Sequence, residues 1–393
     1  MEPLTFIFIC LVSAYLASEC CKAVGIPRVV GQIIAGFVLG IPFLRSYIMS
    51  PTNLDILAFL AQIGSVLLFF FIGLEINLRR AEQSAKTGLY VSLFNTLIPL
   101  ALGYGVSHWV FGLSNTVGIV IGLCLGVSSQ AIALDLLDEL GMLKSKIGQL
   151  IITAGAVDDL VELFLVGAVV TMVNSTTAAF SIFTIILDVV VFFVLVALFK
   201  FFLVPSMMRC TETKHLEISL FTGSLIIVLL MSVLAEKLGI GGLMGGLFAG
   251  ILIRQTLLKD QACNEHMVAR TVEVISFGFL VPMLFVYIGF TTDLSTIQTN
   301  LLFTLLITAI AIGGTVLGTA WAVMLRGWSF EEGELVGWGV SPKGDTELVI
   351  AALALQKGII TIPIFSSLVV MAVVTTFIAP IAFRYMARKQ LKA

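Results

Sequence analysis

Charged side chains are scarce in this sequence of 393 residues. They make up 12% of the chain, against roughly 25% in an ordinary soluble domain, while 59% of the residues are hydrophobic. Apolar runs of about 20 residues, the length that crosses a bilayer as a helix, recur with most of the charge lying between them. The composition therefore excludes a soluble domain and predicts an all-α integral membrane protein.

Patterns for metal or nucleic-acid binding are also missing. The six cysteines show no CxxC or metal-ligand spacing, so we interpret them as small apolar packing residues. Neither basic nor aromatic patterning favours nucleic acid as a partner, and no cofactor is expected. The first six residues contain Glu2 and no Lys or Arg, unlike a signal peptide, so the first apolar run is predicted to be a true span.

The apolar runs predict about 13 transmembrane helices. We place them at 4–24, 28–44, 53–75, 87–111, 115–138, 147–171, 178–205, 216–236, 239–257, 269–290, 299–325, 334–355 and 360–388.

The basic residues predict the orientation in the membrane. With the N-terminus outside, eighteen of the 22 Lys and Arg fall on the cytoplasmic side, three on the opposite side, and Lys343 within the membrane. The positive-inside rule then predicts a multi-pass protein of the cell membrane with an outside N-terminus and a cytoplasmic C-terminus. Such an arrangement needs an odd number of spans.

Three segments of the first half recur in the second half. Residues 30–36 resemble 244–250, 70–78 resemble 286–294, and 126–130 resemble 339–343, at offsets between 213 and 216 residues. Spans 1–6 then correspond to spans 8–13, with span 7 as a linker, and the shift by seven spans inverts the second copy. Inverted repeats are typical of secondary transporters, whose substrates bind near the midplane between broken helices.

Spans 5 and 12 are the candidates for crossed broken helices. Span 5 contains Ser128 and Ser129 after a glycine, and span 12 contains Ser341-Pro-Lys-Gly-Asp345. A kinked helix without a ligand is the alternative. We expect Asp345 to face the positive N-terminal end of one half-helix and Lys343 the negative C-terminal end of another. Glu347 is expected to pair with Lys343.

Adjacent carboxylates in span 6, Asp158 and Asp159, lie in mid-bilayer by length. Ionised carboxylates there are costly and normally mark an ion or proton path, although they can also only cap polar neighbours. A carboxylate binds either Na⁺ or a proton, and this exclusivity couples the two flows. Thr153, Ser128 and Ser129 can add oxygen ligands.

Two further acidic residues lie near these spans. Glu162 follows Asp158 at i+4, so at least one of the two is expected to hold a proton. Glu75 ends span 3 and is either interfacial or in the core.

Over essentially its full length the chain resembles the monovalent cation:proton antiporters, especially the bacterial sodium/proton antiporters with paired aspartates. The matching segments are 30–36, 70–78 with Glu75, 128–131, 137–141, 156–159, 288–294 and 341–345. The resemblance implies Na⁺ binding at Asp159, which would carry both cation and proton, with Asp158 as its neighbour.

The resemblance also implies a domain organisation. It implies a homodimer in which 1–75 and 216–290 form the dimer domain, 178–205 the linker helix, and 87–171 and 299–388 a core domain that moves in alternating access.

Two positions depart from the family pattern. Thr315 stands where current-generating members carry a lysine that pairs with the first aspartate, and Pro342-Lys-Gly-Asp345 replaces the usual Pro-Arg-Gly-Glu. Without that lysine, Asp158 is expected to keep its proton through the cycle. One Na⁺, or one Li⁺, would then cross for one H⁺ in an electroneutral exchange.

Three rival functions remain open. The nearest is a K⁺/H⁺ exchanger like the membrane part of glutathione-gated potassium efflux systems, which tend to carry Gln-Asp at 158–159 and continue into a nucleotide-binding domain. Sodium:organic-anion symporters share this kind of fold. An intramembrane aspartyl protease needs its two aspartates on different helices, so no enzymatic activity is expected.

Overall fold

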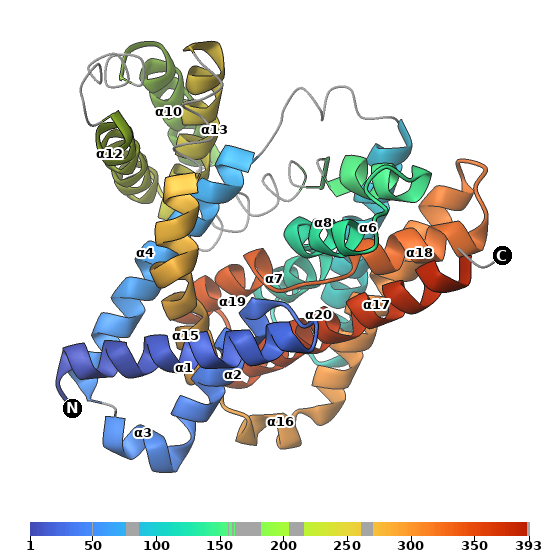
Figure 1. The fold of residues 1–393 in the computed structure, drawn as a ribbon, viewed down its shortest axis with the longest axis horizontal. Helices are drawn as coiled ribbons and strands as arrows, with labels where there is room; N and C mark the ends of the chain where they lie inside the picture. The colour runs from blue at the N-terminus through green and yellow to red at the C-terminus, as the bar shows by residue number, and fades with distance from the viewer. Residues whose placement is uncertain are drawn as a thin grey trace. The chain divides into compact units, whose positions relative to one another are not determined.

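The computed structural model describes residues 1–48, 50–75, 86–155, 157–158, 161, 182–203, 216–260 and 270–390. Within these ranges the regular elements are helices (Figure 1). By contact the chain divides into two compact units. Unit 1 comprises Met1–Leu11, Ile48–Ile76 and Val170–Tyr287, and unit 2 comprises Val12–Tyr47, Asn77–Val169 and Ile288–Ala393.

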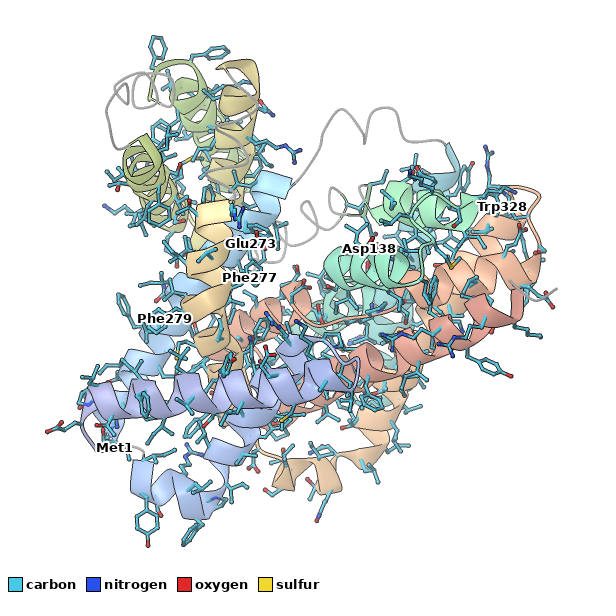
Figure 2. All side chains as sticks on the ribbon, in the orientation of Figure 1. Met1, Asp138, Glu273, Phe277, Phe279 and Trp328 are labelled. Carbon is cyan, nitrogen blue, oxygen red and sulfur yellow. The ribbon has the colours of Figure 1, made fainter. Side chains whose placement is uncertain are left out.

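Unit 1 is built around long apolar helices. It contains the start of α1 (Pro3–Ala23), α4 (Pro51–Glu75), α10 (Ile182–Leu198) with a π-helical turn (Phe199–Leu203), α12 (Leu216–Lys237), α13 (Gly242–Asp260), a second π-helical turn (Ser276–Leu280) and most of α15 (Val281–Thr291). Phe71 of α4 and Phe277 pack edge to face with centroids 5.1 Å apart, and Phe277 is labelled in Figure 2.

Helices α4 and α13 approach so closely that only glycine fits between them. A Cβ atom at Gly73 would overlap the carbonyl oxygen of Leu247, and one at Gly250 would overlap that of Phe70. At the end of the pair, the Arg254 guanidinium donates to the Leu74 carbonyl at 2.8 Å. A cation at a helix C-terminus stabilises the negative end of the helix dipole.

Unit 2 holds the remaining helices. They are α2 (Arg28–Gly40), α3 (Pro42–Ile48), α6 (Lys86–Gly105) with a π-helical turn (Val106–Val110), α7 (Asn115–Gly126), α8 (Gln130–Glu139), α16 (Ser295–Thr299), α17 (Leu301–Met324), α18 (Phe330–Val340), α19 (Thr346–Gln356) and α20 (Ile362–Gln390). Residues 146–155 are helical as well.

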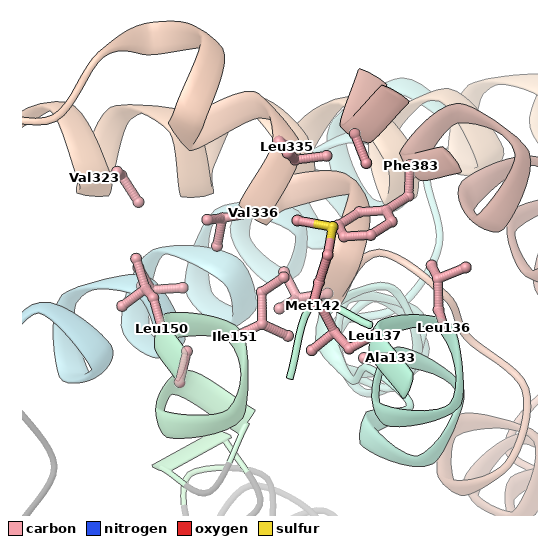
Figure 3. Close-up of a cluster of buried hydrophobic side chains, with 14 of the residues drawn as sticks. Ala133, Leu136, Leu137, Met142, Leu150, Ile151, Val323, Leu335, Val336 and Phe383 are labelled. Carbon is pink, nitrogen blue, oxygen red and sulfur yellow. The ribbon is translucent and has the colours of Figure 1, made fainter. Parts of the chain in front are cut away.

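A buried apolar cluster positions the helix of residues 146–155 in unit 2. Ile151 of that helix, Leu137 of α8 and Leu335 of α18 are each no more than 1% exposed (Figure 3). Phe383 of α20 packs in the same cluster. Since burying one such side chain is worth about 1.5–3 kcal/mol, this cluster fixes the helix that leads to Asp158.

Membrane-spanning helices are plainly present. In the described part of the chain, seven helices are long and apolar enough to cross a membrane, or eight if the bent pair α2 and α3 is one span. The prediction of one helix over 28–44 is wrong, because the chain bends by 82° between these two helices. Pro42 has no N–H to continue the ladder and disfavours helical backbone at Ile41, which has φ −57° and ψ 133°.

Candidate functional site

Two broken helices meet in unit 2. Helix α7 ends at Gly126 and α8 begins at Gln130, with Val127 extended (φ −68°, ψ 142°), and α18 ends at Val340. The Ser129 backbone N–H donates to the Pro342 carbonyl at 2.8 Å, so the two interruptions are joined to each other. Breaks of this kind leave helix ends in the protein interior, where their backbone groups need partners.

Lys343 and Asp345 supply such partners. Lys343 is fully buried, and its Nζ donates to the carbonyl of Val127, the C-cap of α7, at 2.7 Å. Asp345 is the N-cap of α19 and accepts from the Thr346 N–H at 2.8 Å and from Ser129 Oγ at 3.0 Å. Each charge thus faces the helix end of opposite polarity, and each break holds the other in shape.

Asp158 lies beside this crossing and is only 3% exposed. Ser92 Oγ and Thr96 Oγ1 donate to its Oδ1 at 3.0 and 2.6 Å. Asn95 Nδ2 and Ser128 Oγ donate to its Oδ2 at 2.8 and 2.6 Å. A carboxylate has about four acceptor positions, so every one of them is matched by a neutral donor. A buried acidic group is thereby held in one orientation without a cationic side chain.

Comparison with known proteins identifies the family. Residues 6–389 match the sodium/hydrogen exchanger, transmembrane family. The chain belongs to this family. Its members are transporters and not enzymes, so the predicted resemblance to sodium/proton antiporters is confirmed and the protease alternative is set aside.

Individual members agree with the assignment. The chain is 29% identical over 390 residues to a "Na(+)/H(+) antiporter" of Enterococcus hirae, covering 99% of each chain. It is 30% identical over 375 residues to the "Na(+)/H(+)-K(+) antiporter GerN" of Bacillus cereus, covering 95% of this chain and 94% of that one.

A solved structure shares the fold. The sodium proton antiporter MjNhaP1 from Methanocaldococcus jannaschii at pH 8 superposes with a TM-score of 0.72 at 15% identity, covering 98% of both chains.

The remaining predicted site residues are spread around the crossing. Asp159 and Glu162 lie outside the described residues, as does the side chain of Glu75, the last residue of α4. Thr153 Oγ1 donates to the carbonyl of Gln149, one turn earlier in its own helix, at 2.6 Å.

Two predicted residues are buried without hydrogen bonds. Thr315, in α17, is fully buried, and its hydroxyl has no hydrogen-bond partner in the described part of the chain. Glu347 is 1% exposed, and both of its carboxylate oxygens lack such a partner there too. The expected pairing of Glu347 with Lys343 is therefore wrong, because Lys343 donates to the end of α7 instead.

The donors from α6 are what the sequence prediction missed. Ser92, Asn95 and Thr96 lie three and four residues apart, which places them on one face of a helix. A polar face of this spacing in an apolar membrane helix is a signal that could have been found, since it needs a polar partner on a neighbouring helix.

Proposed function

We propose that this chain is a secondary active antiporter that exchanges Na⁺ for H⁺ across the cell membrane by alternating access. The observation that carries the proposal is the buried Asp158 beside two crossed broken helices in a chain of the sodium/hydrogen exchanger family. The neighbouring Asp159 carries the exchanged ion, because a single carboxylate that holds either Na⁺ or a proton makes the exchange obligatory.

Equivalent glycine contacts support the inverted repeat. In unit 2, a Cβ at Gly289 would overlap the carbonyl oxygen of Ile33, and in unit 1 one at Gly73 would overlap that of Leu247. The glycines are 216 residues apart and their partners 214, matching the offsets between the recurring segments.

The same correspondence holds for a second contact. Gly31 approaches the backbone of Ala17, and Gly245 approaches that of Met231, with both members of the pair shifted by 214 residues. Two copies of one helix arrangement explain these coincidences more simply than independent packing does.

Topology and assembly complete the proposal. The distribution of Lys and Arg supports thirteen spans, an outside N-terminus and a cytoplasmic C-terminus. By analogy with the family, the chain works as a homodimer in which a core domain of 87–171 and 299–388 moves against the dimer domain.

The exchange is proposed to be electroneutral. Thr315 lies where a lysine would be needed to move an additional charge, and the described donors to Asp158 are uncharged. If one Na⁺ crosses for one H⁺, a membrane potential, worth about 2.3 kcal/mol per charge per 100 mV, performs no work on the cycle. Clamping the potential with K⁺ and valinomycin should leave the steady Na⁺-driven pH change unaltered. A pH change that follows the clamped voltage would refute electroneutrality.

One experiment tests the function itself. Purified protein in liposomes with an imposed pH gradient is titrated in turn with Na⁺, Li⁺ and K⁺ while a pH-sensitive dye reports the lumen. Na⁺ should dissipate the gradient. A response to K⁺ alone would favour the second candidate, K⁺/H⁺ exchange, which the name of the Bacillus cereus relative keeps in view. No response to any of the three cations would refute the proposal.

A further inference from the structure

A cavity of about 410 Å³ in unit 2 lies outside the ion site. It is lined where the connection between α1 and α2 meets α8 and α20. Lys22, Arg28 and Arg384 contribute the charge, and Ile132, Leu136 and Pro380 contribute apolar surface. A volume of this size suits a small ligand.

The described lining of this cavity contains basic residues and no acidic one. Arg28 also pairs with Glu19 at 2.8 Å, but both side chains are about half exposed, so solvent screens that pair. Arg384 donates to the Gly25 carbonyl at 3.4 Å, which holds the guanidinium against the connection. The surroundings are therefore electropositive.

The N-terminus of α2 adds to this potential. Pro27, its N-cap, lines the cavity and provides no side-chain cap, so the first N–H groups of a helix of 13 residues remain available at this end. The helix dipole places about half a positive charge there, and such ends bind phosphate and other anions. Cationic side chains and a helix N-terminus thus converge on one cavity.

Gly25 shapes the wall of the cavity. Its φ of +74° is favourable only for glycine, and a Cβ there would come within 3.2 Å of Arg384 Nη1. The connection can therefore bend directly beneath the guanidinium.

We propose that this cavity binds a phosphate group, carried either by an anionic phospholipid or by a free phosphate solute. Phosphate suits a planar guanidinium, an ammonium and backbone N–H donors, while the apolar wall suits the glycerol and first methylenes of a lipid. On the proposed orientation the cavity opens towards the cytoplasmic side.

Resting on the proposed function, a bound phosphate also restrains transport. Lys22 and Arg28 belong to the proposed dimer domain, whereas Arg384 and the α8 residues belong to the proposed core. A ligand held by both sides resists their relative displacement, so occupancy should slow exchange.

Two binding arms distinguish the source of the phosphate. In detergent, the melting temperature of the full chain is compared in Tris phosphate and in Tris chloride at equal ionic strength. In nanodiscs, phosphatidylcholine alone is compared with phosphatidylcholine containing phosphatidylglycerol, and bound lipid is counted by native mass spectrometry. Stabilisation by inorganic phosphate identifies a free solute as sufficient, and retention of phosphatidylglycerol alone identifies the lipid.

Single-charge variants locate the binding. Lys22→Gln and Arg384→Gln should each weaken it about fivefold, the equivalent of roughly 1 kcal/mol per basic residue. Arg384→Lys keeps the charge and should retain most of the affinity, and Lys389→Gln, exposed in the last turn of α20, is the matched control.

Equal binding by Lys22→Gln, Arg384→Gln and Lys389→Gln would overturn the site. So would a wild-type protein that neither ligand stabilises, a measurement that needs no variant to fold. Because binding is read without transport, lost exchange with intact binding would refute only the proposed function. Exchange that responds to Na⁺ in a protein that binds no phosphate would refute only the cavity.

Discussion

Replacing Asp158 by asparagine tests both the geometry around this residue and its proposed neutrality. An amide oxygen can accept from Asn95 and Ser128 as the carboxylate Oδ2 does. The new NH₂ group would face the hydroxyls of Ser92 and Thr96, which can rotate to accept instead of donate. Asp158→Asn should therefore fold, with every polar group around position 158 still paired.

Asp158→Leu should behave very differently. It is close in volume but leaves four donors facing an apolar side chain, at a cost of about 1–3 kcal/mol for each unsatisfied group. Taking the low end for all four gives roughly 4 kcal/mol, since the hydroxyls can partly recover by bonding to carbonyls of their own helix. The melting temperature in detergent should fall by several degrees for Asp158→Leu and little for Asp158→Asn.

Transport then separates the two possible roles of Asp158. If Asp158 keeps its proton throughout the cycle, Asp158→Asn should exchange Na⁺ for H⁺ in liposomes at a rate close to that of the wild type. A variant that folds with an unchanged melting temperature and yet transports nothing would refute this reasoning. Asp158 would then have to ionise, and its four neutral donors would serve to stabilise the charge.

Three further outcomes are expected. Asp159→Asn should abolish Na⁺-driven dequenching of a pH dye without lowering the melting temperature, and wild-type exchange would move the carrier elsewhere. Lys343→Met leaves the end of α7 without its buried cation and should cost about 1–3 kcal/mol in stability, whereas Lys389→Met should cost almost nothing. The Ser329 backbone N–H lowers the pKa of Glu332 below its ordinary 4.5, so this stabilisation is complete above that pH and is lost as the pH falls through the depressed value. The wild type should therefore lose melting temperature more steeply on acidification than Glu332→Gln, and parallel curves would contradict the assignment.

The breaks could be predicted from the sequence because their causes are local. Gly126 and Pro342 weaken the helix where they stand, and polar neighbours provide partners for the freed backbone groups. The bend before Pro42 has an equally local cause, and a single span over 28–44 overlooks it. Local rules therefore set where the helices end.

The surroundings of the carboxylates could not be predicted in the same way. Adjacent residues point about 100° apart on a helix, so only the packing decides that Asp158 faces α6. The environment of Lys343 depends likewise on Val127, 216 residues away. Contacts of this range follow from the assembled fold and not from any local pattern.

The glycine contact between α4 and α13 has a mechanical consequence. Gly246 lies against Val66 and Gly250 against Phe70, so the two helices mesh at positions four residues apart. A gradual slip would drive a side chain into backbone, and the shortest slip that puts a glycine opposite Phe70 again is one of four residues, about 6 Å. Below that step the pair behaves as one stiff strut, which transmits a push along its length without absorbing it.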